Sequence, residues 1–332
     1  MAPRRGRTRH RWSGAGTPVT AALDALVATL DLETIELNLF RGYSPAERTM
    51  TRVFGGQVAG QALVAAGRTL TGGAGPPRLV HSLHSYFLRP GDPSIPILYE
   101  VDRIRDGRSF TTRRVAAIQR GEAIFHLSAS FHLAEDGVDH QDPMPAVPRP
   151  ESLPGWKHQM APYAERLGGR YRLPEPLDLR PVGTAARSEG PSGPPSGAVE
   201  GPGFRRRAHH QVWFRADGLL PDDPLLHACV VAYASDMTLL DTVMLPHGLI
   251  WEGHGSGSQA SLDHAMWFHR PFRADDWLLY DQRSPSAAGA RGLAMGSIFT
   301  SHGTLVVTVV QEGLIRTTPR PPAGQGRAPA GT

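Results

Sequence analysis

Hydrophobic and polar positions follow a helical period in three stretches of this chain. Two of them are residues 57–70, built mainly from alanine, glycine and valine, and residues 227–240, which include Ala228, Val231, Ala232 and Ala234. A shorter one lies within residues 18–39, where apolar residues recur at i, i+3, i+4 and i+7 from Leu23 to Leu30. The pattern predicts three helices. The helices at 57–70 and 227–240 carry few bulky side chains, and we call them the lean helices. Such helices can lie very close to a sheet.

Segments with the two-residue alternation of β-strands follow each lean helix. After the first helix these segments are 80–88, 95–104, 109–119 and 123–133. A turn at Arg120-Gly121-Glu122 predicts a hairpin between the last two. One strand, at 211–215, precedes the second helix, and the segments that follow it are 261–268, 277–282, 290–299 and 305–315. A helix followed by antiparallel strands, twice over, predicts an α+β architecture.

The two halves of the chain carry matching sequence features about 180 residues apart. V-H-S-L-H-S-Y-F-L-R-P at 80–90 and S-L-D-H-A-M-W-F-H-R-P at 261–271 share an aromatic position and a terminal Arg-Pro at an offset of 181. Such a repeat predicts a duplicated domain. We expect an unstructured basic tail, an N-terminal unit, a linker with a flexible Gly/Pro-rich tract at 184–208, a C-terminal unit and a second unstructured tail, over residues 1–17, 18–135, 136–208, 209–318 and 319–332.

Composition and charge limit the possible location of the protein and its possible partners. The chain has 332 residues, of which 40% are hydrophobic, and a formal net charge of +4. It has no run of about 18 apolar residues and no secretory signal, so we expect a cytoplasmic protein without membrane insertion. Its single cysteine, Cys229, excludes an internal disulfide. Arginines cluster at 4–11 and 205–207, where they can meet phosphates. We interpret both clusters as solvated segments and expect no nucleic-acid partner.

Five motifs in order along the chain resemble one enzyme family. They are F-G-G-Q-V-A-G-Q-A-L (54–63), H-S-Y-F-L-R-P-G-D (84–92), A-Y-A-S-D (232–236), L-D-H-A-M-W-F-H-R-P-F (262–272) and V-Q-E-G (310–313). Together they are similar to the type II acyl-CoA thioesterases, the bacterial TesB group and its peroxisomal relatives. The resemblance implies a double hotdog fold and assembly into a homo-oligomer. It also implies an acyl-CoA substrate that is hydrolysed to a free acid and CoA, without a covalent intermediate and without a metal or other cofactor.

The resemblance further implies an Asp, a Ser or Thr, and a Gln that bind and activate water. In this sequence the three fall on Asp236, Ser261 and Gln311. The residue types suit the reaction, because a thioester is already activated and water suffices as its nucleophile. A carboxylate can accept the water's proton, and a hydroxyl and an amide can orient the water. We expect backbone N–H groups near a helix start to stabilise the oxyanion.

The internal repeat indicates that only one unit carries this set. At offsets of 181 and 182 the first unit has Val80 and Ala129 where the second has its serine and glutamine. Around the helices, the aspartate aligns near Gln57. The first unit therefore lacks the full set, which predicts one catalytic site per chain, in the second unit. We expect the substrate-binding wall of that site to come from the loop residue His247 and from three residues of the first unit: Gly55, Gly56 and Gln57.

Each member of the set also has a structural interpretation, as a helix cap, a strand-start hydroxyl or a buried amide that needs partners. Asp263, His264 and His269 could suggest a metal or acid–base cluster. Strand alternation puts His264 on the face opposite the other two, so we expect structural hydrogen bonds there and no metal site.

Two other functions fit the sequence. One is a hydratase or dehydratase acting on acyl-CoA, which would pair an acid with a histidine such as His247. The other is a non-enzymatic acyl-CoA-binding module. A serine hydrolase and a dinucleotide enzyme are both disfavoured, because the chain contains neither G-x-S-x-G nor G-x-G-x-x-G.

Overall fold

The computed structural model describes residue 12 and residues 20–45, 51–70, 77–167, 169–172, 175–183, 208–247 and 257–317. The N-terminal unit contains two helices and six strands: α1 (Ala21–Leu30), β1 (Glu33–Glu36), β2 (Leu39–Gly42), α2 (Gly55–Arg68), β3 (Arg78–Phe87), β4 (Ile97–Asp106), β5 (Phe110–Gln119) and β6 (Glu122–Leu133). The connection contains short helices and one strand: α3 (Trp156–Met160), α4 (Ala164–Leu167), α5 (Gly169–Arg172) and β7 (Leu177–Pro181).

The C-terminal unit repeats the pattern of the first. Its elements are β8 (His209–Ala216), α6 (Pro224–Ser235), α7 (Asp241–Met244), β9 (Gly257–Ser261), β10 (Asp263–Phe268), β11 (Leu278–Ala288), β12 (Arg291–Thr300) and β13 (Leu305–Thr317). The three predicted helices and the predicted strands of both units are therefore present. The predicted hairpin is also present, with β5 and β6 joined through Arg120 and Gly121, which both have the positive φ that a tight two-residue turn requires.

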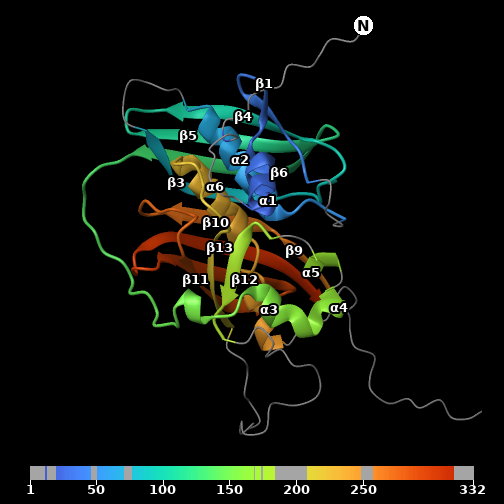
Figure 1. Cartoon of the computed structure of the whole chain (residues 1–332). Coiled ribbons are helices and arrows are strands. Elements are labelled where there is room, and N and C mark those ends of the chain that lie inside the picture. The colour runs from blue at the N-terminus through green and yellow to red at the C-terminus, as the bar shows by residue number, and fades with distance from the viewer. Residues whose placement is uncertain are drawn as a thin grey trace, which may run out of the picture.

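All strands of the two units join in one sheet. The order is β1-β2-β4-β5-β6-β3-β10-β13-β12-β11-β8-β7, and β9 pairs with β13 off this path. The units meet where β3 pairs antiparallel with β10, at Ala265 opposite His84. Figure 1 shows the N-terminal unit (blue to teal) above the C-terminal unit (orange to red), with β10 and β13 at their junction.

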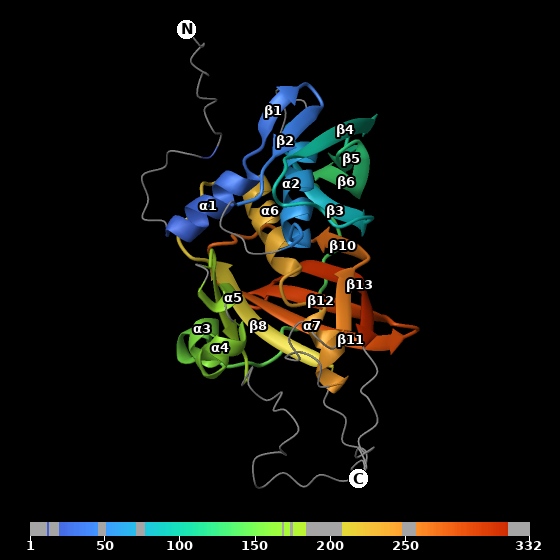
Figure 2. The ribbon, with the colours of Figure 1, turned by 90° about the vertical axis from the view of Figure 1, so that its right-hand side faces the viewer.

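The two lean helices, α2 and α6, pack against each other in opposite directions, as Figure 2 shows. The start of α2 meets the end of α6, where a Cβ on Gly56 would come within 2.4 Å of the Tyr233 carbonyl. The other ends meet where a Cβ on Gly67 would come within 2.5 Å of Leu225. Small residues thus allow two central helices to touch inside one sheet. None of the helices in the described ranges is long and apolar enough to span a membrane.

Part of the predicted linker covers the outer side of the C-terminal sheet. Met144, Val147 and Leu153 pack there against a small cluster of buried side chains formed by Trp213, Leu279 and Phe299. The Trp213 indole also donates a hydrogen bond to the Pro148 carbonyl at 2.9 Å. This segment is therefore part of the packed structure. The Gly/Pro-rich tract at 184–208 lies almost wholly outside the described residues.

The sequence repeat aligned Asp236 of the second unit near Gln57 of the first, and the structure shows that this alignment is wrong. Gln57 lies in the first turn of α2, whereas Asp236 is the C-cap of α6. The residue at the corresponding end of α2 is Thr69, its own C-cap. The alignment slipped because the two helices differ in length and in the loops that follow them. The structure brings Gln57 and Asp236 to the same end of the helix pair only because α2 and α6 are antiparallel.

Trp12 is the one residue of the predicted N-terminal tail that the structure describes, and it is buried. Its indole N–H donates to Asp223 Oδ2 at 3.0 Å, and the Arg68 guanidinium lies 5.2 Å from its ring. Trp12 thus sits at the end of α2 and the start of α6, opposite the end that carries Asp236. At this residue the expectation of a solvated tail is wrong.

Replacing Trp12 with alanine is expected to lower the free energy of unfolding by about 3 kcal/mol, since it removes a buried aromatic side chain. Trp12→Phe is the matched control. It keeps a ring beside Arg68 and loses one hydrogen bond, so the expected loss is about 1 kcal/mol. Urea denaturation of the full chain measures both. Equal stability of wild type and Trp12→Ala would show that this contact does not hold the first residues to the fold.

Candidate active site

Asp236, Ser261 and Gln311 converge, although they come from three separate elements. Asp236 caps the C-terminus of α6, Ser261 ends β9, and Gln311 lies on β13. The Gln311 amide donates to Asp236 Oδ1 at 2.6 Å and to Ser261 Oγ at 2.9 Å. Ser261 Oγ donates to the same Oδ1 at 3.2 Å. Each side chain therefore contacts the other two, and Asp236 Oδ1 receives two hydrogen bonds.

The start of α2 closes the cluster from the first unit. The Gly56 N–H hydrogen-bonds to the Asp236 carboxylate. A Cβ on Gly55 would come within 2.7 Å of Asp236 Oδ2 and within 2.8 Å of the Phe87 ring, so only glycine fits beside this oxygen. The first unit thus brings a helix N-terminus, with its partial positive charge, to the carboxylate of the second unit.

Burial and hydrogen bonding act in opposite directions on Asp236. Burial raises the pKa of its carboxyl group to about 6, while hydrogen bonds from Gln311, Ser261 and Gly56 oppose the rise because they favour the ionised form. A carboxyl group with a pKa near 6 is ionised at neutral pH and accepts a proton more readily than an ordinary aspartate. The environment therefore suits Asp236 to act as a base.

The four predicted substrate-binding residues are placed differently. Gly55 and Gly56 lie against Asp236, as described above. The Gln57 side chain turns toward its own unit and donates to Ser44 Oγ at 3.0 Å. His247 is exposed at the end of a 3₁₀ turn, and none of the described hydrogen bonds joins it to the cluster. Roles for Gln57 and His247 in substrate binding stay predictions.

The other polar residues of β10 and its flank form structural hydrogen bonds, as predicted. Asp263 Oδ1 accepts from the Glu312 N–H at 2.7 Å, and the His269 imidazole lies 2.8 Å from Thr308 Oγ1. His264 is fully buried on the other face of the strand, with Nε2 2.8 Å from Ser235 Oγ. The burial pattern of β10 agrees with the predicted alternation, because His264 is buried and its neighbour Asp263 is only partly buried.

Sequence reasoning missed two aromatic residues that pack at the start of α2. The Phe54 ring lies in edge contact with Tyr233 of α6, with ring centroids 5.0 Å apart. Phe87, at the end of β3, reaches the Gly55 backbone. Both residues lie within the motifs that carry the resemblance, but the repeat only showed that Phe87 has a counterpart in Phe268. Nothing in the sequence indicated that Phe87 faces the site.

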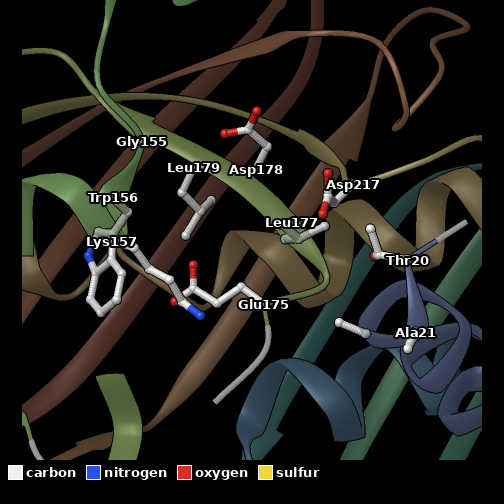
Figure 3. A pocket seen from close by; sticks show the side chains of 11 residues that line it. Thr20, Ala21, Gly155, Trp156, Lys157, Glu175, Leu177, Asp178, Leu179 and Asp217 are labelled. Carbon is white, nitrogen blue, oxygen red and sulfur yellow. The ribbon is translucent and has the colours of Figure 1, made fainter. Parts of the chain in front are cut away.

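A cleft of about 430 Å³ lies elsewhere, between the start of α1, α3 and β7. Figure 3 shows Trp156, Lys157 and Asp178 along its lining. The Asp178 carboxylate accepts hydrogen bonds from Arg180 at 3.1 and 2.9 Å. The cleft shares no lining residue with the Asp236 cluster, so the two are separate features of the surface.

Comparisons with known proteins agree with this geometry. The family described as acyl-CoA thioesterase matches residues 197–314, and the acyl-CoA thioesterase N-terminal domain matches residues 44–132. Acyl-coenzyme A thioesterase 8 of Homo sapiens is 40% identical, over 92% of this chain and 93% of the relative. Acyl-CoA thioesterase 2 of Haemophilus influenzae is 38% identical, over 89% of this chain and 98% of the relative.

Solved structures support the same grouping. An acyl-CoA thioesterase II from Mycobacterium marinum has 47% identity and a TM-score of 0.68, covering 89% of this chain and 98% of that chain. A hot dog fold protein from Alicyclobacillus acidocaldarius has 19% identity and a TM-score of 0.67, with 91% of this chain and 100% of that chain covered. The fold is thus a double hotdog, with two helix-and-sheet units in one chain. The chain belongs to the acyl-CoA thioesterase family and is an acyl-CoA thioesterase. Membership of this family argues against a non-enzymatic acyl-CoA-binding module and favours thioester hydrolysis over hydration.

Proposed function

We propose that the protein hydrolyses acyl-CoA by direct attack of a water molecule that Asp236, Ser261 and Gln311 bind and activate. The convergence of the three side chains carries this proposal. Asp236 Oδ1 is held by two hydrogen bonds, which fix the carboxylate in one orientation. Its Oδ2 lies close to the Gly55 backbone, where a Cβ would come within 2.7 Å of it. The water and the thioester carbonyl would meet beside this carboxylate.

The proton transfers balance without a covalent intermediate. Asp236 takes one proton from the water as the water oxygen bonds to the carbonyl carbon, and the carbonyl oxygen becomes an oxyanion. The positive end of α2, which begins at Gly55, stabilises that charge. When the tetrahedral intermediate collapses, the C–S bond breaks and the CoA thiolate leaves. The proton on Asp236 passes to the thiolate or to solvent, which restores the base.

The pH dependence of the reaction tests the role of Asp236. Because the pKa of its carboxyl group is raised to about 6, kcat/KM is expected to fall about tenfold per pH unit below pH 6 and to level off above it. Thiol release can be followed between pH 4.5 and 8, with circular dichroism at each pH to show that the protein stays folded. A rate that is flat across this range, or that rises as the pH falls, would contradict an ionised Asp236 as the base.

A further inference from the structure

Two buried polar atoms at the proposed catalytic cluster take part in none of the hydrogen bonds found between described residues. They are Gln311 Oε1 and His264 Nδ1, and both side chains are fully buried. A buried polar atom left unpaired destabilises the fold, because it has lost its hydrogen bonds to water. Each atom can satisfy the other, because an amide oxygen is an acceptor and a protonated imidazole nitrogen is a donor.

The sheet register places these two side chains opposite each other. β10 pairs antiparallel with β13, with Ala265 opposite Val310 and Met266 opposite Val309. One step further along this register, His264 lies opposite Gln311. Both point to the helix side of the sheet, as Met266 and Val309 do two residues away, and all four are buried. Directly opposed residues have Cβ atoms about 5 Å apart, which is close enough for their polar ends to meet.

The other side of the His264 ring reaches the residue that precedes the catalytic aspartate. His264 Nε2 lies 2.8 Å from Ser235 Oγ. The same hydroxyl is also placed to donate to the Ala232 carbonyl at 3.0 Å, in the last turn of α6, so its one proton can go to either acceptor. His264 therefore spans the gap between the end of α6 and Gln311 on β13, behind the water-binding cluster.

We infer that His264 is a positioning residue for the reaction, whose neutral ring carries its proton on Nδ1 and donates it to Gln311 Oε1. This contact fixes the Gln311 amide so that its Nε2 faces Asp236 and Ser261, the orientation that the structure shows. The inference rests on the proposed function, since it concerns the glutamine that orients the water. In this tautomer Nε2 accepts the single hydroxyl proton of Ser235, which then points to the ring and not to the Ala232 carbonyl, and the contact links the end of α6 to Gln311.

The charge state of His264 agrees with this arrangement. Burial lowers the pKa of its imidazole to about 4, and hydrogen bonding with the Gln311 side chain opposes that shift. The ring is therefore neutral at working pH, so one nitrogen donates and the other accepts. Sequence reasoning predicted His264 as a structural hydrogen-bonder. The inference assigns that hydrogen bonding a part in catalysis.

Two substitutions of His264 test the contacts of its two ring nitrogens separately. The amide nitrogen of His264→Asn falls near the position of Nδ1 and keeps a donor toward Gln311. The longer side chain of His264→Gln falls near Nε2 and keeps only the contact with Ser235. We expect kcat within about threefold of wild type for His264→Asn and about 10- to 100-fold lower for His264→Gln, because a misplaced orienting group slows the reaction. KM is expected to stay within about twofold for both, since neither contact involves the substrate.

The matched pair makes the test specific. Wild-type kcat in His264→Gln, or equal losses in the two variants, would overturn the inference. An inactive wild type would instead count against the proposed function, so the two failures are distinct. A measurement on the wild type alone guards against misfolded variants. Nitrogen-15 NMR of labelled histidine is expected to show a proton on Nδ1 of His264, and a proton on Nε2 would also overturn the inference.

Discussion

Replacing Asp236 with asparagine is expected to lower kcat for acyl-CoA hydrolysis by about 10²- to 10⁴-fold, the range that a general base contributes. Asparagine has nearly the same shape, and its Oδ1 can still accept hydrogen bonds from Gln311 and Ser261. It cannot accept a proton from water. Binding of a non-hydrolysable acyl-CoA analogue is expected to persist, which calorimetry would show. Wild-type turnover in Asp236→Asn would contradict the assignment of the base.

Asp236→Asn is expected to raise stability although it lowers activity. The stability measurement is therefore the control for structural damage. Burial raises the pKa of Asp236 from an ordinary 3.8 to about 6, so keeping it ionised in the folded state costs about 3 kcal/mol. The cost is absent below pH 3.8, grows between pH 3.8 and 6, and is complete above pH 6. Asp236→Asn removes it. The variant is therefore expected to be more stable than wild type by up to about 3 kcal/mol at pH 8, and by little at pH 4, in urea denaturation. Lower stability of the variant at pH 8 would indicate structural damage as the cause of lost activity.

A single methyl group at Gly55 is expected to lower kcat/KM by about 100-fold. Its Cβ would come within 2.7 Å of Asp236 Oδ2 and 2.8 Å of the Phe87 ring, so the carboxylate or the ring must move. Displacements of about 1 Å in a catalytic group cost rates of this size.

A matched glycine provides the control for Gly55→Ala. Gly137 lies in the linker, and a Cβ there would have no atom within 4 Å. Gly137→Ala is expected to keep wild-type kcat/KM, as measured by thiol release under the same conditions. If Gly55→Ala is as active as Gly137→Ala, the space beside Asp236 Oδ2 is not where the reaction takes place.

The sequence allowed the fold to be predicted because its patterns are local and repeated. The lean stretches at 57–70 and 227–240 correspond to α2 and α6, and the repeated strand segments correspond to the two halves of the sheet. The helix boundaries differ by a few residues, and α6 ends at Ser235, five residues before the predicted end. The short β1–β2 hairpin was missed because its strands are four residues each, too short to show an alternation, and β1 is mostly polar.

Contacts between distant parts of the chain limited the prediction of the site. The resemblance indicated Asp236, Ser261 and Gln311, and the structure shows them in mutual contact. The approach of Gly55 to Asp236 depends on the antiparallel packing of α2 and α6, which no periodicity reveals. The burial of Trp12 could not be predicted for the same reason, because it depends on contacts with Arg68 and Asp223, which lie far along the chain. In each case a single residue contacts a partner that only the folded chain brings near.

The most direct test of this account is thiol release by the full-length wild-type protein from acyl-CoAs of short to long chain length, with the acyl product identified by mass spectrometry. We expect release of CoA together with one equivalent of free acid from at least one chain length, and no acyl group bound to the protein when the reaction is stopped during turnover. Accumulation of an acylated protein would contradict direct attack by water. Folded protein that binds acyl-CoA but releases neither thiol nor acid from any of them would contradict the account as a whole.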